Sequence, residues 1–232
     1  MFYYYFDPMY LIFAIPAFLI SIFAQIKVQA AFSKYSKMRS FSGMTGAEVA
    51  KSILWANGIY DVKVEYVPGL LTDHYDPRFR VLRLSSGVFD SNSIAAIGIA
   101  AHEAGHAIQH YQRYPWLSLR SAMVPVVNIG SNLAFPLILI GLLFKNGDIF
   151  INLGILLFCV AVGFTLVTLP VELNASKRAI QALRLAGVVM PSEEEGVKKV
   201  LSAAAMTYVA AVAVAIIQLL YYLSLVQRRR DD

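Results

Sequence analysis

The chain has 232 residues, of which 58% are hydrophobic, and its mean hydropathy is +0.58. This composition excludes an ordinary soluble domain. The net charge of +5 at pH 7 does not indicate a nucleic-acid-binding protein, because the basic residues flank apolar runs and no motif for DNA or RNA binding is present.

Four apolar stretches are long enough to cross a bilayer, which requires about 20 residues. They run from about residue 10 to 26, 122 to 144, 149 to 169 and 200 to 226. The first is predicted to be a retained anchor, since the segment Met1–Asp7 before it is not basic and no small-residue cleavage site follows. Only the turn Lys145–Asp148 separates the second and third stretches, which predicts a tight helical hairpin.

The predicted fold is therefore a mainly α, polytopic membrane protein with about four transmembrane helices and a small α+β unit in the cytoplasm. Its predicted parts are an N-terminal anchor (1–26), a cytoplasmic part (27–121), a transmembrane hairpin (122–169), a cytoplasmic helix (170–199), a transmembrane helix (200–226) and a basic tail (227–232).

The orientation in the membrane follows from the positions of the basic residues. One side carries Lys27, Lys34, Lys37, Arg39, Arg113, Arg120, Lys177, Arg178 and Arg184, whereas the turn between the second and third stretches carries only Lys145. The positive-inside rule therefore places the two polar regions in the cytoplasm and the N-terminus outside. The basic tail Arg228–Arg230 opposes this assignment, and the side of the C-terminus stays open.

The polar region 27–121 is predicted to contain first a helix and then two strands. Thr45–Glu48 is a capping box for a helix that Gly58 ends. The segment Val62–Val67 alternates apolar and charged residues, which predicts a half-exposed strand, and Phe79–Ser85 is a second strand candidate. The second strand is suited to holding an extended substrate by edge pairing, but a plain hairpin that covers the core is equally consistent.

A helix is predicted from Ile94 to about Gln112, with Ser91 or Ser93 as its cap. It contains the motif H-E-x-x-H, formed by His102, Glu103 and His106. Histidines at positions i and i+4 lie on one face of a helix, so both imidazoles can bind one Zn²⁺. The glutamate between them can act as general base on the water that the metal activates, which indicates a zinc hydrolase. The small α+β unit is therefore predicted to be a zincin-like catalytic unit.

A catalytic zinc usually has three protein ligands, so one more is needed. His110 would lie about 12 Å along the helix axis from His102, which is too far for one ion. A third histidine six positions beyond the second is absent, because residue 112 is Gln112. Glu172 is the better candidate, since it follows the third apolar stretch and the hairpin returns the chain to the same membrane face; the alternative is a carboxylate in the first turn of a helix, stabilised by the helix dipole.

The chain resembles the YugP family of bacterial membrane zinc peptidases across nearly its whole length. The similar segments are Thr72–Pro77, Leu82–Ser85, Ala100–Gln109, Leu169–Glu172 and Val200–Tyr208. The resemblance implies a neutral zinc metallopeptidase of the gluzincin type, more distantly similar to HtpX and the CAAX-prenyl membrane proteases, in a bacterial plasma membrane. In those relatives an Asp stands where this chain has Ser176, and a hydroxyl there is predicted to support the site more weakly.

His74 lies in the segment Asp73–Pro77, ahead of the second predicted strand. One interpretation is that His74 or Tyr75 donates a hydrogen bond to the oxyanion that forms when water attacks a peptide carbonyl. The other interpretation is a turn around Asp76 and Pro77 with a surface histidine.

Two functions remain after these observations. The first is an integral membrane zinc metalloendopeptidase that cleaves membrane proteins or their cytoplasmic extensions, with Glu103 as the base. The second is a non-catalytic membrane scaffold with a structural metal site, which would not need a glutamate between its histidines. An enzyme with zinc deep in the bilayer is disfavoured, because Arg113 and Arg120 follow the motif closely. The substrates are expected to be membrane proteins that reach the zinc from the lipid bilayer or its surface.

Overall fold

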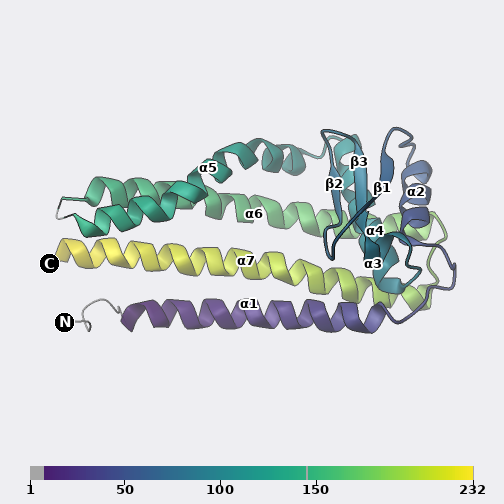
Figure 1. Ribbon diagram of the computed structural model, residues 1–232, viewed down its shortest axis with the longest axis horizontal. Coiled ribbons are helices and arrows are strands. Elements are labelled where there is room, and N and C mark those ends of the chain that lie inside the picture. Colours follow the sequence, from purple (N-terminus) through teal and green to yellow (C-terminus); the bar gives the residue numbers. More distant parts are fainter. Residues whose placement is uncertain (1–7, 145, 232) are drawn as a thin grey trace. The chain divides into compact units, whose positions relative to one another are not determined.

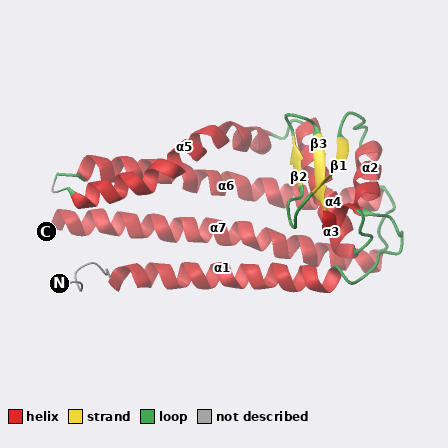
Figure 2. Cartoon of the chain, viewed as in Figure 1, coloured by secondary structure: helices red, strands yellow, loops and turns green. Residues whose placement is uncertain are grey.

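The computed structural model describes residues 8–144 and 146–231, so the segment Met1–Asp7, Lys145 and Asp232 lie outside the described residues. In chain order the elements are α1 (Pro8–Tyr35), α2 (Gly46–Ala56), β1 (Lys63–Val67), β2 (His74–Asp76), β3 (Val81–Ser85), α3 (Ser86–Phe89), α4 (Ile94–Tyr111), α5 (Pro115–Leu143), α6 (Asp148–Leu185) and α7 (Pro191–Asp231). Figure 1 labels them, and Figure 2 shows how strongly helix predominates over strand. The predicted mainly α class with a small sheet is confirmed.

Among the described residues, four helices, α1, α5, α6 and α7, are long and apolar enough to cross a membrane, which confirms the predicted number of spans. Each extends beyond its apolar run at one end or at both. In α6 the helix passes Pro170 and extends to Leu185. Glu172 therefore lies in the interior of a helix of 38 residues, and the alternative that placed it in the first turn of a helix is wrong.

The segment 170–199 is not one helix, because α6 ends at Leu185 and α7 begins at Pro191. Gly187 ends α6 with a φ of 63°, a backbone conformation that glycine adopts without steric cost. The amide of Val188 donates to the carbonyl of Leu183 at 3.1 Å, which satisfies one of the last carbonyls of the helix.

The chain packs into two compact units, which are described separately. Unit 1 comprises the described residues up to Gln25, Leu119–Leu169 and the described residues from Thr207 onward. Unit 2 comprises Ile26–Ser118 and Pro170–Met206. Unit 1 thus contains most of the four apolar runs. The predicted boundaries of the membrane spans stay predictions, since these units are defined by packing and not by lipid.

Within unit 1, the end of α7 lies beside the hairpin between α5 and α6. The guanidinium of Arg229 donates to the carbonyls of Gly141 and Phe144 at 2.7 and 2.6 Å and pairs with Asp148 at 2.9 Å. The side chain thus caps the C-terminal end of α5, where helix carbonyls lack partners. At the start of α1, the ring of Tyr10 contacts that of Tyr221 with centroids 5.3 Å apart. The N-terminal end of α1, the C-terminal end of α7 and the hairpin turn therefore share one end of unit 1.

The sheet of unit 2 has the order β1-β3-β2, with β3 parallel to β1 and antiparallel to β2. Both edges of β3 are therefore paired, and its side chains are the most buried of the three strands. Two predictions are wrong for this reason. The strands β1 and β3 do not form a hairpin, and β3 has no free edge that could hold a substrate.

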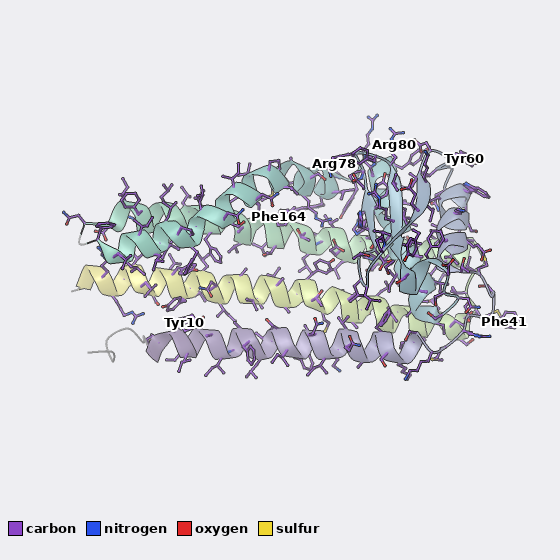
Figure 3. All side chains as sticks on the ribbon, viewed as in Figure 1. Tyr10, Phe41, Tyr60, Arg78, Arg80 and Phe164 are labelled. Carbon is purple, nitrogen blue, oxygen red and sulfur yellow. The ribbon has the colours of Figure 1, made fainter. Side chains whose placement is uncertain are left out.

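The strand β2 forms one edge of the sheet, at a place where the sequence predicted no strand. The connection from β2 to β3 projects from the sheet, and Figure 3 shows Arg78 and Arg80 at its outer surface. The side chain of Arg78 is 82% exposed. The charges of this connection therefore face solvent rather than the interior of the unit.

The core of unit 2 is formed by α2, α4 and β3, together with the C-terminal part of α6 and the N-terminal part of α7. The predicted capping box is confirmed, because Thr45 and Glu48 make both of its hydrogen bonds. Ser93 caps α4 by accepting from the amide of Ala96, which confirms the predicted helix. The largest fully buried apolar side chains are Val49, Ile53, Leu54, Ile59, Leu82, Leu84, Val88, Ile97, Val171 and Leu183.

Candidate metal centre

The helix α4 presents His102 and His106 on one face, one turn apart. Their rings stand nearly perpendicular, with centroids 4.8 Å apart and an interplanar angle of 86°. His106 is buried and His102 is only slightly exposed. This arrangement is what the spacing of four residues requires, because side chains at i and i+4 stack on a helix surface.

Glu172, from α6, completes a cluster of three groups that could bind one metal ion. Its Oε2 lies 3.1 Å from Nε2 of His102 and 3.5 Å from Nε2 of His106. Ligand atoms at neighbouring corners of a zinc tetrahedron lie about 3.3 Å apart, given bonds of about 2.0–2.1 Å. The three side chains therefore have the chemistry and the spacing that a zinc ion requires, and all three belong to unit 2.

Gly105 lets α4 and α6 approach closely enough for this cluster to form. A Cβ atom at position 105 would lie 2.6 Å from the carbonyl oxygen of Ala175, which is far inside van der Waals contact. A side chain there would push α6 away from α4. Because Glu172 stands on α6 one turn before Ser176, such a shift would separate the carboxylate from both histidines.

Two polar side chains support the histidines on the side away from Glu172. Nδ1 of His102 lies 3.1 Å from Oγ of Ser176. Nδ1 of His106 lies 3.0 Å from Oε1 of Gln109. Such partners orient a ligating imidazole and fix which nitrogen faces the metal. The sequence reasoning assigned no role to Gln109, although its position three residues after His106 on one helix face is a usable indication.

The cluster is electrostatically coupled. Burial opposes the charged form of His106, but the hydrogen bond to Glu172 and the charges of Glu103 and Glu172 outweigh it, so the pKa of His106 is raised. Burial likewise works against ionisation of Glu172, yet its hydrogen bonds to His102 and His106 lower the pKa of this carboxyl. Both groups lie outside the predicted membrane spans, since His106 is on α4 and Glu172 follows Leu169, where the apolar run of α6 ends. Two buried carboxylates beside two imidazoles favour the binding of a divalent cation, because its charge would offset theirs.

Glu103 is also buried, at 9% exposure, and lies directly after the first histidine of the motif. Among the described residues its carboxylate has no side-chain hydrogen bond or ion pair. Burying a carboxylate without such a partner is destabilising. A carboxylate at this position could hold a water molecule beside a bound metal ion.

The other two histidines are not members of the cluster. His110 accepts or donates a hydrogen bond of 2.8 Å between its Nδ1 and the hydroxyl of Tyr75 in β2. Burial raises the pKa of Tyr75 to about 12, so this hydroxyl keeps its proton. His74 is held elsewhere, with Nδ1 2.7 Å from the carbonyl of Thr72 and Nε2 3.3 Å from Arg83. The oxyanion role of His74 stays a prediction, whereas Tyr75 is the residue of this pair that contacts the metal helix.

Comparisons with known proteins agree with the chemistry of the cluster. The model of a family described as "putative neutral zinc metallopeptidase" matches residues 10–227. The chain is 50% identical over 224 residues to a protein of Bacillus subtilis (strain 168) named "Putative membrane protease YugP". The similarity covers 97% of this chain and 99% of the relative. No solved structure matches the chain.

Proposed function

The chain belongs to this neutral zinc metallopeptidase family, and from that premise we propose that it is an integral membrane zinc metalloendopeptidase that cleaves membrane or membrane-associated proteins near the cytoplasmic membrane surface. The observation that carries the proposal is the convergence of His102, His106 and Glu172 with Glu103 beside them. Zinc, when bound, supplies a Lewis acid and lowers the pKa of a water molecule toward about 7.

In the proposed reaction this chain's own residues move one proton. Glu103 accepts the proton of the water as its oxygen attacks the peptide carbonyl, and it returns that proton to the nitrogen of the leaving amine as the peptide bond breaks. His102, His106 and Glu172 hold the metal, and Ser176 orients His102. A non-catalytic scaffold with a structural metal is the second candidate, but it gives no reason for the buried carboxylate of Glu103.

The free edge of β2 is the proposed place for an extended substrate segment. Tyr75 joins β2 to His110, one helical turn beyond His106 on α4. A peptide that pairs with a strand edge gains main-chain hydrogen bonds without a requirement for a particular sequence. The role of holding the substrate, predicted for the strand directly before α4, is therefore reassigned to β2, and Tyr75 is the proposed donor to the oxyanion.

Unit 2 is proposed to face the cytoplasm, because the basic residues outside the apolar runs favour that side. After replacement of Cys159, a membrane-impermeant thiol reagent added to intact cells should label an Asn146→Cys variant, in the hairpin turn. It should not label a Ser42→Cys variant, in unit 2. Permeabilised cells serve as the control, since both cysteines should then react. The reverse pattern in intact cells would place the catalytic unit outside.

The proposed substrates reach the zinc from the membrane side, because the ligand Glu172 follows the apolar run of α6 by three residues and the run of α5 begins shortly after α4. The charge-free start of α4, residues 94–101, does not indicate contact with lipid, since nearly all of it is buried by protein. A membrane anchor raises the effective concentration of a substrate at such a site without any new contact.

We therefore expect purified protein in liposomes to cut a membrane-tethered substrate at least about tenfold faster than the same segment freed from its anchor. Both rates should vanish with a zinc chelator and return with added zinc. Equal rates at equal bulk concentration would contradict membrane-side access, and no chelator-sensitive cleavage of any substrate would contradict the peptidase itself.

A further inference from the structure

Gln109 of α4 is completely buried, with 0% exposure, although the proposed reaction gives it no part. Burying an amide destabilises a protein unless its hydrogen bonds are made. The Nε2 of Gln109 lies 2.8 Å from the carbonyl oxygen of Val171 and 3.0 Å from Oδ1 of Asn174. Its Oε1 lies 3.0 Å from Nδ1 of His106. One side chain thus connects a predicted metal ligand on α4 with the residues on either side of Glu172 on α6.

The orientation of this amide is fixed by chemistry. The carbonyl of Val171 can only accept, so the atom facing it must be the amide nitrogen of Gln109. The second hydrogen of that nitrogen points to Oδ1 of Asn174, which also accepts from Nε of Arg178 at 2.6 Å. An arginine only donates, which independently identifies the Asn174 atom as oxygen. The remaining atom of Gln109, its oxygen, therefore faces His106.

It follows that Nδ1 of His106 carries a hydrogen and donates it to Gln109. The lone pair of the neutral ring is then on Nε2, the nitrogen that lies 3.5 Å from Oε2 of Glu172. In the opposite tautomer, Nδ1 and the Gln109 oxygen would be two acceptors facing one another. The amide thereby selects the tautomer in which Nε2 of His106, the nitrogen nearer to Glu172, has a free lone pair for a metal ion.

The donor end of the same amide holds α6 in register. Val171 directly precedes Glu172 and Asn174 follows two residues later, so both hydrogen bonds restrain the backbone that carries the carboxylate. The close contact at Gly105 allows α6 to approach, but contact alone does not prevent sliding or rotation of the helix. Two directional hydrogen bonds from a buried group do.

We propose that Gln109 is a positioning residue that sets the affinity of the site for zinc, by fixing the tautomer of His106 and the placement of Glu172 together. The inference rests on the proposed function only in taking His102, His106 and Glu172 as the zinc ligands. Partners of this kind typically contribute about 10–100-fold in metal affinity.

The test uses the full-length protein in detergent and measures zinc dissociation constants by competition with a chelator. Gln109→Met keeps the length of the side chain and removes both the acceptor and the donors, so zinc should bind about 10–100-fold more weakly. Gln109→Glu keeps an oxygen for His106 but turns a second oxygen toward the Val171 carbonyl, so it too should lose at least about tenfold. Gln181→Met is the matched control, because Gln181 is an exposed glutamine on α6 in the same unit.

Cobalt substitution adds a readout of geometry. The visible absorption of bound Co²⁺ should shift in the Gln109 variants and stay unchanged in Gln181→Met. The melting temperature of the metal-free proteins identifies variants that fail to fold, and if Gln109→Met fails, Gln109→Glu decides. A zinc Kd within about twofold of the unchanged protein, with a lower melting temperature alone, would overturn the proposal in favour of a packing role. Failure of the unchanged protein to bind zinc would refute the proposed function instead.

Discussion

A Glu172→Ala variant is expected to lose its zinc as severely as a His106→Ala variant. Catalytic zinc depends on three protein ligands, and removal of the carboxylate leaves two imidazoles on a single helix. Since loss of a supporting residue alone costs about 10–100-fold, loss of this ligand should weaken binding by more than about 100-fold. Metal analysis of the purified variant, beside the unchanged protein, measures the effect.

The matched control for this experiment is Glu195→Ala, which removes a carboxylate from an exposed ion pair with Lys199 on α7. It should keep its zinc in full. Near-stoichiometric zinc in the Glu172→Ala protein would refute the assignment of this ligand. The search for a third ligand would then turn to His110 or His74.

A Glu103→Gln variant should show the opposite combination, with zinc retained and cleavage lost. The amide has nearly the shape of the carboxylate but cannot accept a proton, so the metal site stays intact while general base catalysis disappears. General acid–base catalysis contributes about 10²–10⁴-fold to a rate, and kcat should fall by that order with little change in KM. Cleavage of the tethered substrate by zinc-loaded protein measures the effect.

The comparison of Glu103→Gln with Glu172→Ala separates base from ligand. Added zinc should restore part of the activity to a weakened metal site, whereas it should not restore Glu103→Gln. If Glu103→Gln loses zinc as readily as Glu172→Ala, then Glu103 holds the metal and another group must serve as base. Full activity of a zinc-loaded Glu103→Gln protein would leave the reaction without the proton transfer proposed here.

Local patterns in the sequence were sufficient for the starts of α2 and α4 and for the four apolar runs. The start of α4 at Ile94, the capping box of α2 and the four apolar stretches all depend on residues within a few positions of one another. The relation of His102 to His106 is of the same kind, because the geometry of one helix sets it. Such features form wherever their own segment is helical.

The sheet could not be predicted in the same way. The pairing of β1 with β3 joins residues about 18 positions apart, with β2 on the other side of β3. A strand of three residues such as β2 carries too little alternation to be recognised. Which strand has a free edge is therefore decided by packing, and this moved the proposed substrate edge from β3 to β2.

The C-terminal arginines are a second case in which the sequence alone was not sufficient. As a count of charges they opposed the predicted orientation, yet Arg229 caps the end of α5 across a separation of 88 residues to Gly141. Because the position of Arg229 is set by its hydrogen bonds to these helix carbonyls, its charge says less about which side of the membrane the C-terminus lies on. Sequence position alone could not distinguish the two roles.

The amino-acid sequence by itself determined the membrane class of this protein, its metal helix and the chemistry of the motif, because these follow from helical periodicity and the properties of individual side chains. The sequence indicated Glu172 as the third ligand but could not show that its side chain lies beside the two histidines. Only the tertiary structure decided that α6 meets α4 at Gly105, that Ser176 of α6 contacts His102, that Gln109 contacts α6 at Val171, and that Glu103 is buried. The physical reason is that hydrogen bonds between groups more than 60 residues apart depend on helix packing, which no short-range pattern encodes.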